Sequence, residues 1–385
     1  MTKEINVAPY QVCTRCVMDT SDAEIVFNPD GVCNHCLRFD KEISTQWFPG
    51  PDGSHKWEQI LLQVKLDGKK NEYDCILGLS GGLDSSLLAL RAKEWGLRVL
   101  AVHVDAGWNS ELAVFNIQQI VQYCDFDLHT IVIDWSEMRD LQVAYLRSGV
   151  SNQDVPQDHA FFASLYAEAT HRNIHYILSG GNIATESIFP KSWHGSAMDR
   201  RSLMSINKHF GNSKLRSFPT IGFLRYYVIN PYFYRLKVLR PLNYMPYDRH
   251  QALLELEDKV GYKDYGRKHG ESLFTRFFQN YLLPKRFGYD KRRPHLSSEI
   301  MSGQITRDEA LQILDQPLYT EADLLADTRY FNKKLRLATG ELEELINLPL
   351  RYHSDYKNQI FMYEFLRKLK NAAERVFHVN LSTNG

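Results

Sequence analysis

The chain lacks an excess of charge of either sign and lacks any long apolar run. Its 46 Lys and Arg residues balance 46 Asp and Glu residues, so the composition does not indicate a nucleic-acid coat or an anchor for acidic membranes. No apolar stretch approaches the roughly 20 residues that span a bilayer, and Met1–Asn6 lacks the apolar region of a signal peptide. We therefore expect a cytoplasmic protein with neither nucleic acid nor membrane among its partners.

Cysteine is also scarce, with six residues in the chain. Because disulfides are rare in the cytoplasm, these cysteines are expected to be metal ligands or core residues. Four of them form two C-x-x-C pairs, and residues 17–32 separate the pairs, which is typical of a four-thiolate zinc ribbon. The segment Asn28–Gly31 is expected to turn at the hairpin tip between them. We predict structural zinc, with two unconnected reduced pairs, or His35 in place of one cysteine, as alternatives. The predicted ligands are Cys13, Cys16, Cys33 and Cys36.

A small-residue turn, Ser80–Ser86 (S-G-G-L-D-S-S), follows the apolar run Cys75–Leu79 and precedes a helix-forming stretch. The lysine of the Walker pattern is missing from this turn. A strand, tight turn and helix aim backbone N–H groups and the positive end of the helix dipole at one point, where a phosphate is held. Ser80 and Ser85 add hydroxyl donors, and Asp84 can hold magnesium. The alternative is a Ser/Gly turn that caps an ordinary helix.

Apolar runs of strand length alternate with helical stretches through the middle of the chain. This alternation predicts a parallel, doubly wound α/β sheet that binds ligands at the carboxyl ends of its strands. Strands are expected over Cys75–Leu79, Val99–Val104, Leu128–Ile133, Ile174–Leu178 and Val238–Leu242, and helices over about 110–123, 159–171, 248–259, 271–282, 307–315 and 321–346.

The turn resembles the S-G-G-x-D-S signature of the PP-loop, or N-type, ATP pyrophosphatases, which cleave ATP between its α and β phosphates and adenylate an acceptor oxygen. In the NAD-synthetase branch a glutamate after the fourth strand shares magnesium with the motif aspartate. Glu186 matches that position; the alternative is a surface acid. Strand two would contact adenine, and Asp105 would accept from the ribose hydroxyls or simply cap its strand. The resemblance assigns catalysis to Ser80, Asp84 and Glu186, and the nucleotide to Ser80, Gly81, Gly82, Leu83, Asp84, Ser85, Ser86, Val102, His103, Asp105, Gly180, Gly181 and Asn182.

The chain as a whole resembles a narrower family, the N-acetyl sugar amidotransferases of bacterial surface-polysaccharide (LPS O-antigen) synthesis. This resemblance implies conversion of an acetamido group on a nucleotide-linked sugar to an acetamidino group, with ATP, Mg²⁺, Zn²⁺ and ammonia. It covers roughly residues 10–315 and rests on Cys13–Thr20 with Cys33 and Cys36, and on Leu79–Ser86, Val104–Asn109, Gly180–Ser187 and Lys285–Arg293.

These resemblances predict three parts for the chain. A zinc-binding module covers residues 1–60, a PP-loop (adenine nucleotide alpha hydrolase-like) domain covers 61–265 with an insertion at about 190–235, and a helical region covers 266–385. Within the last, Pro284–His295 packs five basic side chains into a short connection. We predict an ordered loop that binds the substrate diphosphate, with a solvated charged face as the alternative. The residues assigned to the substrate are Lys285, Lys291, Arg292 and Arg293.

The nitrogen source is expected to lie outside this chain. A glutaminase with an amino-terminal nucleophile starts with cysteine, whereas this chain begins Met1-Thr2, and neither Cys75 nor Cys124 has the glycine pattern of a nucleophile elbow. Both are instead expected in the core. The family's usual arrangement is a separate glutaminase with a barrel-type ammonia-channel partner.

Two rival functions remain open. A tRNA-thiolating enzyme also joins cysteine-bound zinc to this ATP loop, but it would need further reactive cysteines and a basic surface. A catalytically inactive nucleotide fold could carry the zinc module for docking. Release of pyrophosphate from ATP would distinguish this inactive module from both enzymes.

Overall fold

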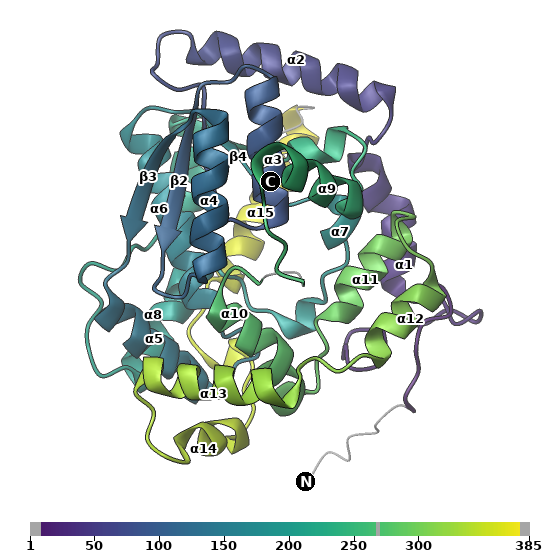
Figure 1. The fold of residues 1–385 in the computed structure, drawn as a ribbon, viewed down its shortest axis with the longest axis vertical. Coiled ribbons are helices and arrows are strands. Elements are labelled where there is room, and N and C mark those ends of the chain that lie inside the picture. The colour runs from purple at the N-terminus through teal and green to yellow at the C-terminus, as the bar shows by residue number, and fades with distance from the viewer. Residues whose placement is uncertain (1–8, 267–269, 378–385) are drawn as a thin grey trace.

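A five-stranded parallel sheet forms the centre of the protein (Figure 1). The computed structural model describes residues 9–266 and 270–377. Residues 1–8 of the predicted zinc-binding module, and residues 267–269 and 378–385 of the predicted helical region, lie outside the described residues. The order β3-β2-β1-β4-β5 changes direction beside β1, which creates a crevice at the carboxyl ends of β1 and β4. The predicted fold class is confirmed. The strands are β1 (Cys75–Gly78), β2 (Val99–Asp105), β3 (Asp127–Val132), β4 (Tyr176–Leu178) and β5 (Lys237–Leu239).

Helices cover both faces of the sheet because alternate strand residues point to opposite sides. Leu77 packs with α2 (Pro51–Gly68), α3 (Leu83–Glu94), α4 (Glu111–Cys124) and α9 (Arg249–Val260). Its neighbour Ile76 packs on the other face with α5 (Trp135–Ser148), α6 (Val155–His171) and α8 (Arg200–Phe210). The first core also contains Cys75 and Cys124, and burial raises the pKa of the Cys124 thiol to about 12. Both thiols are core residues, as predicted.

Several helices of the C-terminal region lie beside the sheet domain (Figure 1), and residues 273–289 and 324–346 pack around Trp108 in a third core. The predicted single helix over 321–346 is wrong. It is two helices, α13 (Glu321–Leu335) and α14 (Glu341–Asn347), because Arg336 and Gly340 both adopt positive φ, at 58° and 84°. The left-handed conformation cannot continue a right-handed helix.

The predicted loop over 284–295 is also wrong. Pro284 lies inside the π-helix η6 (Phe278–Phe287), which continues α10 (Leu273–Phe277), and α11 (Arg292–Met301) starts within the basic run. Pro294 is tolerated because the first turn of a helix needs no N–H donor at that position. The remaining elements are α1 (Asn34–Arg38), η1 (Phe39–Ile43), η2 (Ser44–Gln46), α7 (Ile183–Glu186), η3 (Lys191–Trp193), η4 (Arg225–Phe233), η5 (Pro241–Tyr244), α12 (Arg307–Asp315), η7 (His353–Asp355) and α15 (Ile360–Phe377).

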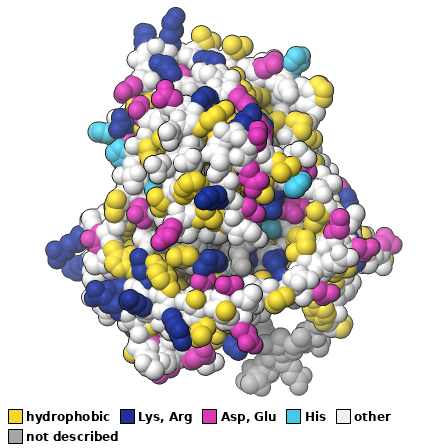
Figure 2. Space-filling model, in the orientation of Figure 1, with side chains coloured by type: hydrophobic (Ala, Val, Ile, Leu, Met, Phe, Trp, Pro, Cys, Tyr) yellow, Lys and Arg dark blue, Asp and Glu magenta, His cyan; other side chains and the backbone are white. Residues whose placement is uncertain are grey.

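The surface carries both signs of charge. Figure 2 shows Lys and Arg interspersed with Asp and Glu over most of one face, with a small group of basic side chains at its lower left. Within the described ranges, no helix is both long enough and apolar enough to cross a bilayer.

Candidate functional site

The turn after β1 is held in one shape by its own hydroxyls. Ser80 Oγ accepts from Gly82 N at 3.2 Å, and Ser85 Oγ donates to the Gly82 carbonyl at 3.1 Å. Gly81 has φ +83°, and a Cβ there would lie 2.8 Å from the Ala113 carbonyl, so only glycine fits against α4. α3 starts at Leu83, which places the positive end of its dipole at the turn.

The end of β4 closes the other side of this turn. A Cβ on Gly180 would lie 2.9 Å from Ser85 N, so the two backbones are in direct contact. Asn182 caps α7 by accepting from Thr185 N at 3.0 Å, and Glu186 ends that short helix. These contacts bring Glu186 to the same side of the sheet as Asp84.

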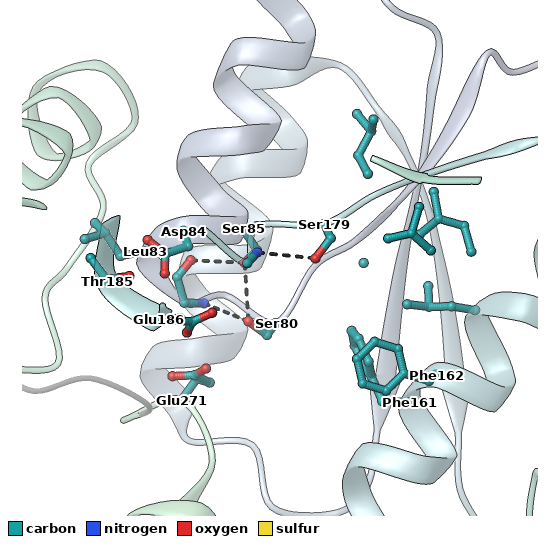
Figure 3. Close-up of a pocket in the computed structure, with 18 of the residues that line it drawn as sticks. Ser80, Leu83, Asp84, Ser85, Phe161, Phe162, Ser179, Thr185, Glu186 and Glu271 are labelled. Carbon is teal, nitrogen blue, oxygen red and sulfur yellow. Dashed lines mark hydrogen bonds between the residues drawn. The ribbon is translucent and has the colours of Figure 1, made fainter. Parts of the chain in front are cut away.

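A pocket of about 220 Å³ lies between the turn, β4 and the segment after β5. It has a polar and an apolar side: Figure 3 shows Asp84, Glu186 and Glu271 around the turn, and Phe161 and Phe162 on α6 opposite them. The predicted site residues among its lining are Ser80, Gly82, Leu83, Asp84, Ser85, Gly180, Gly181 and Glu186.

Tyrosines from the segment after β5 support the site. Tyr247 donates a hydrogen bond to Asp84, and burial, together with the Asp84 charge, raises the pKa of Tyr247 and keeps it protonated. Tyr265 donates to the Gly81 carbonyl at 3.0 Å. Arg249 brings a positive charge to the lining.

The sequence motifs missed these residues and Glu271. One sequence signal was available for Tyr247, Arg249 and Tyr265, which follow β5, because residues that follow a parallel strand lie at the sheet edge where ligands bind. Nothing in the sequence marked Glu271, which reaches the turn from the start of the C-terminal region: a Cβ on Gly82 would lie 3.1 Å from Glu271 Oε1.

The residues assigned to adenine and ribose lie outside this pocket. The Val102 carbonyl accepts from Leu79 N at 2.9 Å. His103 Nδ1 donates to the Leu79 carbonyl at 2.9 Å, and Nε2 accepts from Asn109. Asp105 accepts from Gly107 N at 2.7 Å, which is the strand-end cap held open as the alternative. These three residues brace the ends of the strands, and their nucleotide roles stay predictions. Ser86 is fully buried in α3 behind the pocket.

The basic residues assigned to a diphosphate are dispersed. Arg292 binds Asp290 and the carbonyls of residues 313, 314 and 316. Arg293 binds Asp19 at 2.9 Å and the Val17 carbonyl. Lys291 Nζ lies 2.9 Å from His194 Nε2, and Lys285 is exposed. None of the four lines the pocket at the turn, and the diphosphate role stays a prediction.

The four predicted zinc ligands come together in one buried cluster. Their sulfurs are 3.9 Å apart for Cys13 and Cys36, 3.6 Å for Cys16 and Cys33, and 3.7 Å for Cys33 and Cys36. A zinc tetrahedron with bonds of about 2.3 Å spaces its sulfurs by about 3.8 Å, so the cluster fits the ion. His35 instead bonds Asp22, with Nε2 2.7 Å from the carboxylate.

The cysteine module contacts α11 and α12, and α11 contacts the helix that bears Glu186. Arg307 donates to the carbonyls of Cys13 and Cys16 at 3.0 and 3.1 Å. On α11, Ser297 Oγ accepts from Val17 N and Ser298 Oγ accepts from Ile188 N. The cysteine module therefore supports the site through packing, and a four-thiolate shell closed around an ion would leave no open position for a substrate.

Purified protein is expected to contain about one zinc ion per chain. Cys36→Ser should lose that ion and lower the melting temperature by more than about 5 °C, because zinc binding contributes directly to folding. Metal analysis and thermal unfolding measure both effects. Cys124→Ser, at a buried thiol outside the cluster, is the control and should retain zinc. A zinc-free wild-type protein with four titratable thiols would contradict the site.

The C-terminal region of this chain is similar to a known family. Residues 271–370 match the family model of the WbpG-like C-terminal domain of LPS biosynthesis proteins. This agrees with the family resemblance drawn from the sequence. Glu271, at the pocket, is the first residue of this WbpG-like segment. No curated protein matches the chain.

Solved structures similar to this chain include three synthetases. NMN synthetase from Francisella tularensis has 15% identity over 77% of this chain and 97% of its own, with a TM-score of 0.30. NAD⁺ synthetase from Burkholderia pseudomallei has 16% identity over 79% of this chain and 98% of its own, also with a TM-score of 0.30. NH3-dependent NAD synthetase from Campylobacter jejuni subsp. jejuni has 16% identity, with a TM-score of 0.28. This match covers 35% of the present chain and 59% of the synthetase.

Proposed function

We propose that the protein is an ATP-dependent amidotransferase that converts an acetamido group of a nucleotide-linked N-acetyl sugar into an acetamidino group. One observation carries this proposal. The S-G-G-L-D-S turn lines a pocket together with Glu186. Glu271 lines the same pocket and belongs to the segment that matches the WbpG-like domain of LPS biosynthesis proteins.

The chemistry needs activation because an amide carbon is a poor electrophile and its oxygen is a poor leaving group. The amide oxygen attacks the α-phosphorus of ATP, and the bond to the bridging oxygen breaks to release pyrophosphate. Ammonia then adds to the resulting imidate carbon, the C–O bond to AMP breaks with its electrons leaving on AMP, and loss of one proton from the added nitrogen leaves the amidinium cation. Each turnover consumes one ATP and one ammonia and yields AMP, pyrophosphate and the amidino sugar.

The chain's contribution is mainly electrostatic. Backbone N–H groups of the turn and the hydroxyls of Ser80 and Ser85 would bind the departing pyrophosphate. Asp84 and Glu186 would hold magnesium, which neutralises phosphate charge when bound. The carboxylates of this pocket would repel ATP alone, so the acidic lining itself supports the need for a divalent cation.

Mass spectrometry provides the direct test. The protein is incubated with ATP, Mg²⁺, ammonium and a panel of UDP- and CMP-linked N-acetyl sugars. A product lighter than its substrate by the difference between O and NH, formed together with AMP, supports the proposal. Pyrophosphate release without a sugar product would favour another acceptor, such as the tRNA of a thiolating enzyme. Absence of both would favour a docking module.

The isolated chain is expected to use free ammonia and to ignore glutamine, since it contains no cysteine placed to hydrolyse an amide. Turnover with ammonium should rise with pH as more of the nitrogen becomes free NH₃. A trace of an unrelated glutaminase is the positive control and should restore turnover with glutamine through released ammonia. We propose a separate glutaminase with a barrel-type channel as the natural source. Substantial amidine formation from glutamine by this chain alone would contradict the proposal that a separate glutaminase supplies the ammonia.

A further inference from the structure

A second and larger cavity, of about 1040 Å³, adjoins the pocket at the turn. Tyr166 and Val238 line both spaces. The lining of the larger cavity includes residues of α8, η4 and the segment from Leu350 to Asn371, which includes most of α15. A ligand that occupies both spaces would place one end at the ATP-binding turn and the rest in this cavity.

The walls of this second cavity are rich in tyrosine. Tyr166 and Tyr226 meet edge to face with centroids 5.3 Å apart, and Tyr227 and Tyr363 are 5.5 Å apart. Aromatic walls bind flat rings and the apolar faces of sugars. Exposed cations at the lining can meet phosphate oxygens. They are Lys191, Arg351 and Arg367.

Asn230 is the polar residue that distinguishes this cavity. Its side chain is fully buried and lines the cavity, yet neither its amide nitrogen nor its oxygen has a hydrogen-bond partner among the described residues. Its backbone is fixed, since Asn230 lies in the π-helix η4 and its carbonyl accepts from Leu236 N, beyond the end of that helix, at 2.9 Å. Native proteins pair buried amides almost without exception, so an unpaired one in the wall of a cavity indicates a ligand group.

We propose that this cavity binds the nucleotide-linked sugar acceptor and that the Asn230 carboxamide pairs with an uncharged ligand group that offers one donor and one acceptor. This inference rests on the proposed function. The group has two sources in such a ligand, the imide or amide edge of the nucleobase and an acetamido substituent of the sugar. Asn230 is thus a specificity-determining residue outside the catalytic turn.

The test is binding measured by calorimetry without ATP, so that it does not depend on catalysis. The ligands are UDP-N-acetylglucosamine, UDP-N-acetylgalactosamine and CMP-N-acetylneuraminic acid. Asn230→Leu, which keeps the side-chain shape, should raise the dissociation constant of the tightest-binding ligand by tenfold or more. Because it also removes an unpaired buried amide, it should not lower the melting temperature. Gln153→Met is the matched control. Gln153 is equally buried and unpartnered among the described residues but does not line the cavity, so its variant should bind normally.

Two kinds of simpler ligand, a free nucleotide and a sugar phosphate, locate the group that Asn230 binds. Loss of affinity for free UDP or CMP in Asn230→Leu assigns it to the nucleobase, and loss for N-acetylglucosamine 1-phosphate assigns it to the acetamido group. Tyr363→Ala removes an exposed wall and should also weaken binding, which keeps the test open if Asn230→Leu does not fold. Unchanged affinity in both variants, or no binding of any of the nucleotide sugars at millimolar concentration, would overturn this inference. Failure of the proposed function would appear separately, in the pyrophosphate and mass measurements.

Discussion

Replacing Asp84 by Asn is expected to lower acceptor-dependent release of pyrophosphate by at least about 10³-fold while the fold stays intact. Asp84 lies in the first turn of α3, lines the pocket and accepts from Tyr247. The amide keeps the size of the side chain but loses the charge that would hold magnesium against the phosphates. A steady-state pyrophosphate assay and thermal unfolding together separate lost chemistry from lost structure.

The control for this change is Asp248→Asn, one residue from the tyrosine that contacts Asp84. Asp248 is exposed and caps α9 by accepting from Gln251 N at 2.8 Å, and Asn is an equally good cap. This variant should turn over normally. Glu186→Gln should shift the magnesium dependence to higher concentration if the two carboxylates share the ion. Near-normal pyrophosphate release by Asp84→Asn would refute the catalytic assignment.

Gly180→Ala is expected to reduce turnover by about 10²-fold, because it pushes on the turn after β1, where we propose that ATP binds, from the end of β4. The added methyl would lie 2.9 Å from Ser85 N and 3.0 Å from the Asp84 carbonyl carbon. Both are backbone atoms that cannot rotate away, so the turn itself must shift. The effect should appear in the maximal rate at saturating ATP and acceptor.

The matched control is Gly222→Ala, since a Cβ at Gly222 meets no atom within 4 Å. That variant should keep full turnover, and any loss it shows would measure the general cost of alanine in place of glycine. Gly180→Ala with wild-type rates would mean that the position of the turn tolerates a shift of this size. The close contact between β4 and the turn would then have no catalytic consequence.

Features that depend on neighbours in the sequence were predictable. Five apolar runs with helical stretches between them were enough to predict a parallel sheet, because the period of hydrophobicity reports local backbone conformation. The thiol spacing predicted the cysteine cluster that the structure contains. The turn at Ser80–Ser85 was predictable because its hydrogen bonds lie within six residues.

Helix ends and loops were less predictable. α13 ends at Arg336, which is neither glycine nor proline. Nothing in that residue type indicated a positive φ. The start of α11 was hidden in a basic run whose interleaved aromatic, glycine and proline residues suggested an ordered loop. In the structure those arginines bind the cysteine module and neighbouring carbonyls, contacts that no local pattern records.

The sequence by itself therefore determined the fold class, the shape of the turn after β1 and the four clustered thiols. Only the tertiary structure decided which side chains surround that turn. Tyr247 reaches Asp84 across 163 residues, and Arg307 reaches the Cys13 carbonyl across 294. The structure also placed His103 and Asp105 outside the pocket and the unpaired amide of Asn230 in the wall of a second cavity. The physical reason is that a turn is closed by its own hydrogen bonds, whereas a pocket forms only when distant segments pack together.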